Sequence, residues 1–102
     1  MNYIYLIQSL ENSYYKVGVS KHPQKRINEL STGNPSKLKL IEVYKSEYAY
    51  QIEKSLQNRY SHLRKEREWF DMSVSHELSF IGECIEIEKN IIFMKSNGNI
   101  FI

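Results

Sequence analysis

The sequence predicts a small α/β (α+β) domain in which a three-stranded antiparallel sheet is flanked by helices. Two runs rich in aromatic and β-branched residues, 3–7 and 14–19, are separated by a short polar segment, as in a β-hairpin. A third such run spans 38–44, and the segments that follow the second and third runs carry apolar residues at helical spacing. These observations together favour a mixed fold with strands at its centre.

The hairpin at 3–19 has an unusual second strand. Alternation with a period of two residues puts Lys16 and Gly18 on one face, opposite Val17. Glycine inside a strand marks a bulge or a place where another group approaches the backbone closely. On the first strand the same alternation puts three side chains on one face, namely Tyr3, Tyr5 and Ile7.

A short helix is predicted over 23–31, because proline opens this segment and Ile27 and Leu30 form a narrow apolar stripe. Arg26 points about 100° away from Ile27. The segment 32–35, Thr-Gly-Asn-Pro, is dense in turn-forming residues. It serves either as a turn alone or as a contact for phosphate, and the sequence leaves both roles open.

The third strand, 38–44, is flanked by lysines and suits an edge of the sheet. A longer helix is predicted from Glu47 to Leu63, with Ser46 as its N-cap. Its apolar residues fall within about 80° of arc around the helix. They are Ala49, Ile52, Leu56, Tyr60 and Leu63.

Glu53 projects at the margin of this apolar stripe. A carboxylate at the edge of a buried face is costly unless it is paired with a cation or binds a metal ion. Helical spacing therefore singles out Glu53 as a candidate functional residue. The structural alternative is a salt bridge to Arg26 or Arg59.

The C-terminal third of the chain carries no motif with recognisable chemistry. Trp69 and Phe70 are expected to lock the end of the long helix against the sheet, and Cys84 is expected to pack inside the fold. Ser73 suits the cap of a further helix with an acidic outer side. Its apolar stripe would be Val74, Leu78, Ile81 and Ile85. The last stretch, 91–102, is predicted to form a hairpin around Asn97-Gly98.

Composition limits the class of protein. A chain of 102 residues forms one domain with a modest core, and its single cysteine excludes an internal disulfide. Residues 1–67 hold 12 Lys and Arg against 6 Asp and Glu, whereas residues 68–102 hold 2 against 6. This asymmetry suits a phosphate-facing surface on the N-terminal part. No apolar run approaches the ~20 residues of a membrane span, and no targeting peptide is apparent, so we expect a cytoplasmic protein.

The order and spacing of these motifs resemble the GIY-YIG nuclease superfamily, in particular a compact phage-associated branch with a K-V-G second motif and a T-G-N-P run. Here the two motifs are Tyr3-Ile4-Tyr5 and Lys16-Val17-Gly18, and Arg26 follows eight residues after Gly18. Glu53 lies on a later helix, and Glu68-Trp69-Phe70 comes after it. The resemblance implies a nuclease domain over 1–72 and a helix and hairpin over 73–102 that extend the same domain.

The resemblance implies a metal-dependent endonuclease that hydrolyses DNA phosphodiester bonds. A phenol is a poor base in water, with a reference pKa of about 10, but adjacent cations favour its phenolate form. Tyr5 would then be the base on the attacking water, and Lys16 would orient that water or tune Tyr5. Arg26 would hold the scissile phosphate, which suits the geometry of a guanidinium. Glu53 would hold Mg²⁺ or Mn²⁺.

The same resemblance extends the predicted substrate contacts to Lys21, Lys25, Gly18 and Asn34. No separate targeting domain is apparent, so a partner protein or self-association would supply sequence specificity. The alternative function is a catalytically inactive module of this fold that binds DNA or another protein. If the chain is phage-encoded, the expected location is the cytoplasm of the host.

Overall fold

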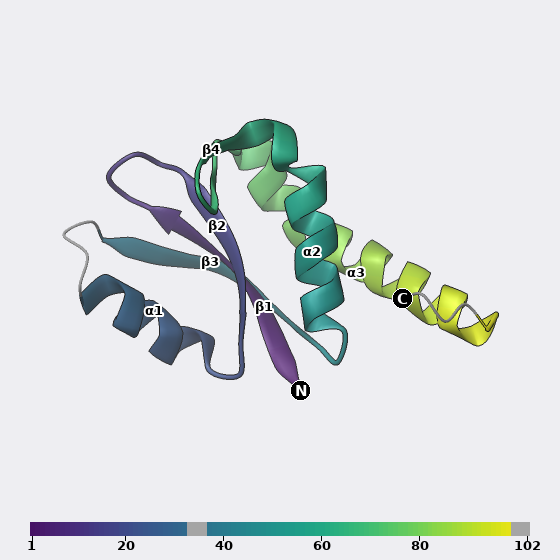
Figure 1. The fold of residues 1–102 in the computed structure, drawn as a ribbon. Helices are drawn as coiled ribbons and strands as arrows, with labels where there is room; N and C mark the ends of the chain where they lie inside the picture. The colour runs from purple at the N-terminus through teal and green to yellow at the C-terminus, as the bar shows by residue number, and fades with distance from the viewer. Residues whose placement is uncertain (33–36, 99–102) are drawn as a thin grey trace.

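The computed structural model describes residues 1–32 and 37–98. The sheet is antiparallel throughout, with the strand order β3-β1-β2-β5-β4 (Figure 1). The elements in chain order are β1 (Asn2–Ser9), β2 (Tyr15–Ser20), α1 (Pro23–Thr32), β3 (Leu38–Ser46), α2 (Ala49–Arg59), the 3-10 helix η1 (Ser61–Leu63), β4 (Arg64–Glu66), β5 (Trp69–Phe70) and α3 (Val74–Ser96). The predicted mixed class is confirmed, but the sheet has five strands instead of three.

The two additional strands are too short to be recognised in the sequence. β4 has three residues and β5 has two, so neither shows an alternating pattern. Arg67, with φ of 49°, lies in the turn between them. The pairing of Phe70 with Tyr15 then attaches β5 to β2. The three strands that the sequence does predict are present, and β3 lies at an edge as expected.

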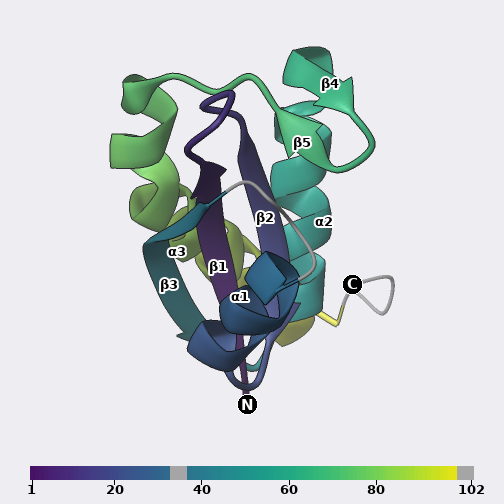
Figure 2. The same ribbon diagram turned by 90° about the vertical axis from the view of Figure 1, so that its left-hand side faces the viewer.

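The helices cover both faces of the sheet. Figure 2 shows α1 in front of the sheet, with α2 and α3 behind it. The larger core lies on the side of α2 and α3, where Ile4, Leu6 and Val17 of the sheet meet Ile52, Leu56, Phe80, Cys84, Ile87 and Ile91 of the helices. On the other side a smaller cluster joins Tyr5 and Ile7 to Ile27 of α1, with Trp69 packed against it.

α2 is shorter than predicted at both ends. The helix begins at Ala49 because the Ser46 hydroxyl accepts a hydrogen bond from the backbone N–H of Tyr48 and so holds the preceding turn. Ser46 is therefore not the N-cap of a helix that begins at Glu47. At its other end the chain leaves α2 through η1 to reach β4.

The face of α3 that packs against the sheet differs from the predicted one. Val74 and Leu78 of the predicted stripe are 64% and 80% exposed, and the buried residues of α3 are Phe80, Cys84, Ile87 and Ile91. Both stripes have the spacing i, i+4, i+7, i+11, so the periodicity alone does not identify the buried one. The expected burial of Cys84 and the helix cap at Ser73 are both confirmed.

The expected acidic outer side of α3 is also wrong. Three of its glutamates instead accept hydrogen bonds from tyrosine hydroxyls of β2, β3 and the end of α2. The pairs are Tyr15–Glu77 at 2.6 Å, Tyr44–Glu88 at 2.7 Å and Tyr60–Glu83 at 2.8 Å. These bonds attach α3 to the rest of the domain.

The predicted C-terminal hairpin is contradicted over its first half, because α3 continues to Ser96. Asn97 and Gly98 follow it, and Gly98 has φ of 76°, a left-handed conformation that glycine adopts at helix ends. The Asn-Gly pair therefore ends a helix and does not reverse a strand. Residues 99–102 lie outside the described part. None of the described helices is long and apolar enough to cross a membrane.

Candidate functional site

The centre of the site is the contact between Tyr5 and Gly18. The two residues are partners in the β1–β2 register, and a Cβ atom placed on Gly18 would lie 2.3 Å from both Cζ and Oη of Tyr5. No real side chain tolerates such a distance, so glycine is required for the Tyr5 ring to lie across β2. The group that approaches the backbone at Gly18 is therefore the ring of Tyr5. A contact between Gly18 and substrate remains a prediction.

The Tyr5 hydroxyl retains access to water although the residue is only 3% exposed. Among the described residues this hydroxyl has no hydrogen-bond partner, whereas none of their fully buried side-chain oxygens lacks one. The Tyr5 oxygen is thus at the surface of the smaller core, above Gly18. The buried ring fixes the position of a phenol whose oxygen can meet a water molecule.

Lys16 lies on the same face of β2 as Gly18, two residues away, and forms an ion pair with Glu68 at 2.8 Å. Its side chain is only 16% exposed. Glu68 immediately precedes β5, and the pairing of β5 with β2 brings it to Lys16. The Lys16 ammonium lowers the pKa of Glu68, with smaller contributions from Arg64 and Arg26, so Glu68 remains charged.

Glu53 of α2 belongs to the same electrostatic environment. Its pKa is raised, first by partial burial and then by the negative charge of Glu68, while Lys16 opposes the shift. The salt bridge considered from the sequence does not form. Within the described ranges, Arg59 pairs with Glu83 and Glu86, and no ion pair engages Glu53.

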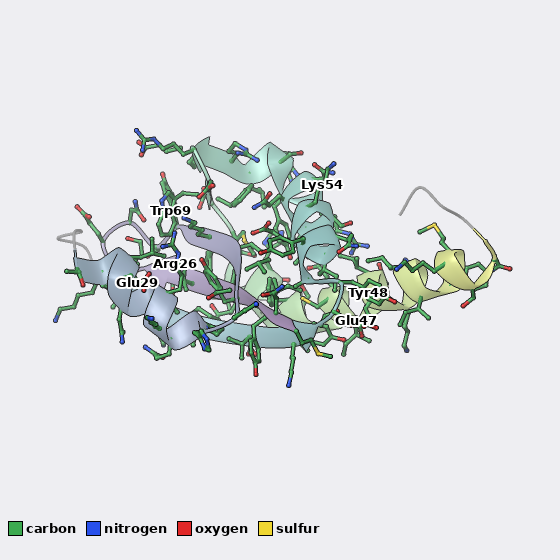
Figure 3. All side chains as sticks on the ribbon, turned by 60° about the horizontal axis from the view of Figure 1, so that its bottom comes forward. Arg26, Glu29, Glu47, Tyr48, Lys54 and Trp69 are labelled. Carbon is green, nitrogen blue, oxygen red and sulfur yellow. The ribbon has the colours of Figure 1, made fainter. Side chains whose placement is uncertain are left out.

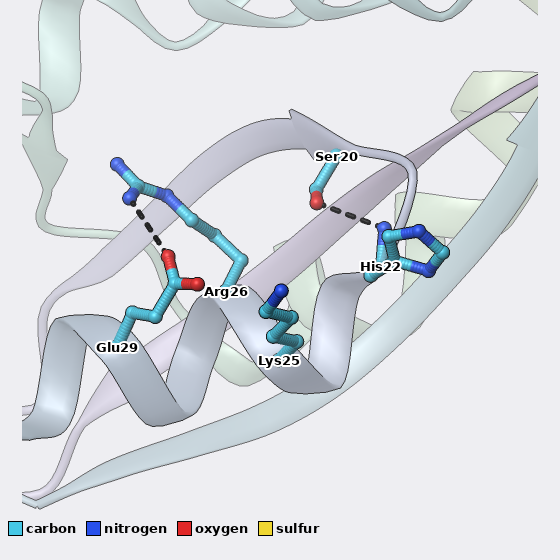
Figure 4. Close-up of a pocket in the computed structure, with 5 residues that line it drawn as sticks. All are labelled: Ser20, His22, Lys25, Arg26 and Glu29. Carbon is cyan, nitrogen blue, oxygen red and sulfur yellow. Dashed lines mark hydrogen bonds and ion pairs between the residues drawn. The ribbon is translucent and has the colours of Figure 1, made fainter.

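Arg26 lies on the exposed side of α1, where its only ion pair in the described part is a loose one to Glu29 at 3.6 Å. A shallow pocket opens beside it, lined by Ser20, His22, Lys25, Arg26 and Glu29 (Figure 4). In Figure 3, Arg26 and Trp69 lie on the same side of the molecule, away from Glu47 and Tyr48 at the start of α2. Since Arg26 contributes to the lowered pKa of Glu68, its charge is felt at the Lys16–Glu68 pair.

Of the other predicted substrate contacts, one lines this pocket. Lys25 lines it, Lys21 is exposed in the loop before α1, and Asn34 lies outside the described residues. Glu68 is the member of the site to which the sequence assigned no role. Its position directly before Trp69-Phe70 was the available signal, because both aromatic residues pack into the fold and hold Glu68 beside β2.

The carboxylates near Lys16 offer few ligands for a divalent cation. In the described part of the chain, no group of three or more His, Cys, Asp or Glu side chains could hold a metal ion. Glu53 is a carboxylate without an ion pair and under repulsion from Glu68, and a bound cation would relieve both conditions. Mg²⁺ keeps several waters and takes one or two carboxylates, so Glu53 is the described residue that could hold it, and its binding there stays a prediction.

The comparison with protein families gives one result that covers most of the chain. The model of the T5orf172 domain, a phage-associated and nuclease-related domain, matches residues 2–89. No curated protein and no solved structure matches the chain. The match extends from β1 into α3 and includes every described residue of the site. The chain therefore belongs to the T5orf172 domain family.

Proposed function

We propose that this chain is a small metal-dependent endonuclease of the GIY-YIG type, which hydrolyses phosphodiester bonds in DNA. The observation that carries the proposal is the Tyr5 hydroxyl, held over Gly18 and open to water, on the strand face that also presents Lys16. Membership of a nuclease-related family supports the reaction class. Phosphodiester hydrolysis needs an activated water and a positive environment for the phosphate.

In this proposal Tyr5 is the general base. Its phenolate takes a proton from water, the water oxygen bonds to phosphorus, and the bond from phosphorus to the leaving sugar oxygen breaks. The leaving oxygen then takes a proton from solvent. Lys16 orients the attacking water or tunes Tyr5, because it presents a positive charge on the same face.

Glu68 is a positioning residue for Lys16. The 2.8 Å ion pair fixes an ammonium that would otherwise move freely on a long side chain. Because its lowered pKa keeps Glu68 charged, the pair persists from neutral to mildly acidic pH. Its carboxylate also adds negative charge close to Glu53, which favours cation binding there.

In this proposal Arg26 and Lys25 hold the phosphate. Both line the pocket beside α1, and Arg26 is held within the described residues only by the loose contact to Glu29. A guanidinium can bind two phosphate oxygens at once, so phosphate would displace Glu29 without breaking a tight ion pair. Mg²⁺ or Mn²⁺ bound at Glu53 would neutralise charge on the phosphate and the leaving oxygen.

Nicking of supercoiled plasmid tests the proposal. The wild-type chain should nick DNA in the presence of Mg²⁺ or Mn²⁺, and EDTA should abolish the nicking. Arg26→Ala and Glu53→Gln should each lower the rate by about 100-fold or more, as the loss of an electrostatic stabiliser does. Lys54→Ala, a change of an exposed charge next to Glu53 on α2, should leave the rate unchanged.

Two results would contradict the proposal. Cleavage that persists in both variants would indicate a contaminating nuclease. A wild-type chain that is inert with every metal and form of DNA would favour the alternative function, a module of the same fold that binds DNA or a protein without cleaving it.

A further inference from the structure

An exposed apolar stripe runs along the whole of α3. Leu78, Ile85 and Ile92 recur every seven residues, and Val74 precedes them by one helical turn. Leu78 is 80% exposed, Ile85 38%, Ile92 46% and Val74 64%. At 100° per residue the four side chains project within about 40° of arc, on a different face from the residues that α3 buries in the core.

We infer that this stripe is the interface of a homodimer, in which α3 packs antiparallel against α3 of a second copy of the chain. A seven-residue repeat of large apolar side chains is the seam along which two helices pack. Gly82 lies beside the seam, and a Cβ atom there would meet nothing within 4 Å, so a second helix can approach closely. The stripe lies on the side of the sheet opposite α1, and the inference does not depend on the proposed function.

Charge selects the antiparallel arrangement. Residues 74–88 of α3 contain four glutamates and no Lys or Arg, whereas residues 89–96 contain Lys89 and Lys95 and no carboxylate. Lys89 projects at the edge of the seam, so parallel pairing in register would oppose the two Lys89 side chains. Antiparallel pairing instead separates the two Lys89 side chains and places the basic end of each helix beside the half of the other that carries the glutamates, whose partners within the chain are tyrosines and Arg59.

The shape of the molecule points the same way. The last turns of α3 extend beyond the sheet and α2 (Figure 1), and they carry Phe93, which is 69% exposed. The other apolar side chains of α3 that are more than 60% exposed, Val74 and Leu78, lie at the opposite end of the helix. With a twofold axis at Ile85, Leu78 meets Ile92 of the second copy, and the projecting end of each helix covers the exposed start of the other.

Sedimentation of the full chain from about 1 μM to 1 mM tests the inference. The wild type should reach twice the monomer mass of 12.2 kDa. Leu78→Glu should be monomeric, because it places two charges in an apolar seam. Leu10→Glu, the same change at a site 55% exposed in the β1–β2 turn, should stay dimeric. Unchanged circular dichroism would show that Leu78→Glu is folded, and Ile92→Glu repeats the test at the other end.

Disulfide cross-linking tests the orientation. Ile85→Cys should cross-link two chains across the twofold axis, and so should the double variant Leu78→Cys, Ile92→Cys, whereas Leu78→Cys alone should not. Burial raises the pKa of the native Cys84 thiol to about 12, so it should not compete. Cross-linking by Leu78→Cys alone would overturn the antiparallel arrangement. A wild type that stays monomeric at 1 mM, or a dimeric Leu78→Glu, would overturn the interface.

Discussion

Tyr5 and Gly18 each restrict what the other position can hold. The Tyr5 ring lies where a side chain at position 18 would be, so Gly18→Ala must displace the ring or shift β2. We expect this variant to lose about 1–3 kcal/mol of unfolding free energy, the usual cost of overpacking, measured by urea denaturation. Gly82→Ala, measured at a concentration where the chain is monomeric, is the matched control, because position 82 is open within the chain and alanine favours a helix. Equal stability of Gly18→Ala and the wild type would contradict the packing described.

Glu53 costs the metal-free fold some stability. Its pKa is raised above the usual value near 4.5, so the folded state holds its proton to a higher pH than the unfolded state. Stability is therefore lost as the pH rises through the raised pKa, and at neutral pH the folded state carries an unpaired charge. In EDTA at pH 7, Glu53→Gln should melt at a higher temperature than the wild type, and the difference should vanish near pH 4.

The effect of Mg²⁺ on stability distinguishes two roles for Glu53, that of a metal ligand and that of an unfavourable charge. Mg²⁺ should raise the melting temperature of the wild type and not that of Glu53→Gln, because only the folded carboxylate binds it. A Glu53→Gln variant that is less stable than the wild type in EDTA would assign Glu53 a structural role.

At the scale of elements, tyrosine–glutamate hydrogen bonds fasten α3 to the domain. Burial, reinforced by Glu77 and Glu88 respectively, raises the pKa values of Tyr15 and Tyr44 to about 12. A hydroxyl whose pKa is raised on folding stabilises the folded state. This contribution is complete below pH 10, the pKa of the hydroxyl in the unfolded chain, and it is lost as the pH rises through 12, its pKa in the fold.

Tyr44→Phe should therefore lose about 1.5–3 kcal/mol at pH 8, the usual value for a hydrogen bond to a charged group. The difference from the wild type should shrink as the pH rises from 10 to 12, because the hydroxyl ionises first in the unfolded state and only near pH 12 in the folded state. Urea denaturation across this range measures it. Tyr50→Phe, at a residue 63% exposed on α2, should show no difference at any pH. A gap that stays constant to pH 12 would argue against the Tyr44–Glu88 bond.

Elements with a single clear period could be predicted from the sequence. β2 and α1 agree with the prediction because each presents one apolar face, and β1 agrees because its run of aromatic and aliphatic residues is buried on both faces. The buried face of α3 differs from the prediction, because this helix is apolar on two faces and only the packed fold determines which face is buried. β5 pairs with β2, β4 pairs with β5, and neither short strand carries a local pattern. The position of Glu68 depends on that pairing, so its role at Lys16 could not be predicted.

At the scale of the whole molecule, DNA should meet the side that carries α1. Lys25 and Arg26 line the pocket there, while the glutamates of α3 lie behind the sheet (Figures 2 and 4). Lys25→Glu should weaken DNA binding and should reduce the slope of log affinity against log salt by about 1, as loss of one phosphate contact does. Lys39→Glu, at an exposed residue of β3 whose register partner Gln8 lies on the face of β1 opposite Tyr5, is the control. DNA affinity is measured by fluorescence anisotropy. Equal losses of affinity in both variants would contradict the assignment of the DNA-binding surface to the side of α1.

A comparison of Tyr5→Phe with Tyr3→Phe tests whether the Tyr5 hydroxyl activates the attacking water. Both residues project from the same face of β1, and both changes remove one hydroxyl and keep the ring. The measurement is the rate of Mg²⁺-dependent plasmid nicking at equal DNA occupancy. Tyr5→Phe should slow nicking by about 100-fold or more, as loss of a general base does, while Tyr3→Phe should match the wild type. Full activity in Tyr5→Phe, or an equal loss in both variants, would contradict the account.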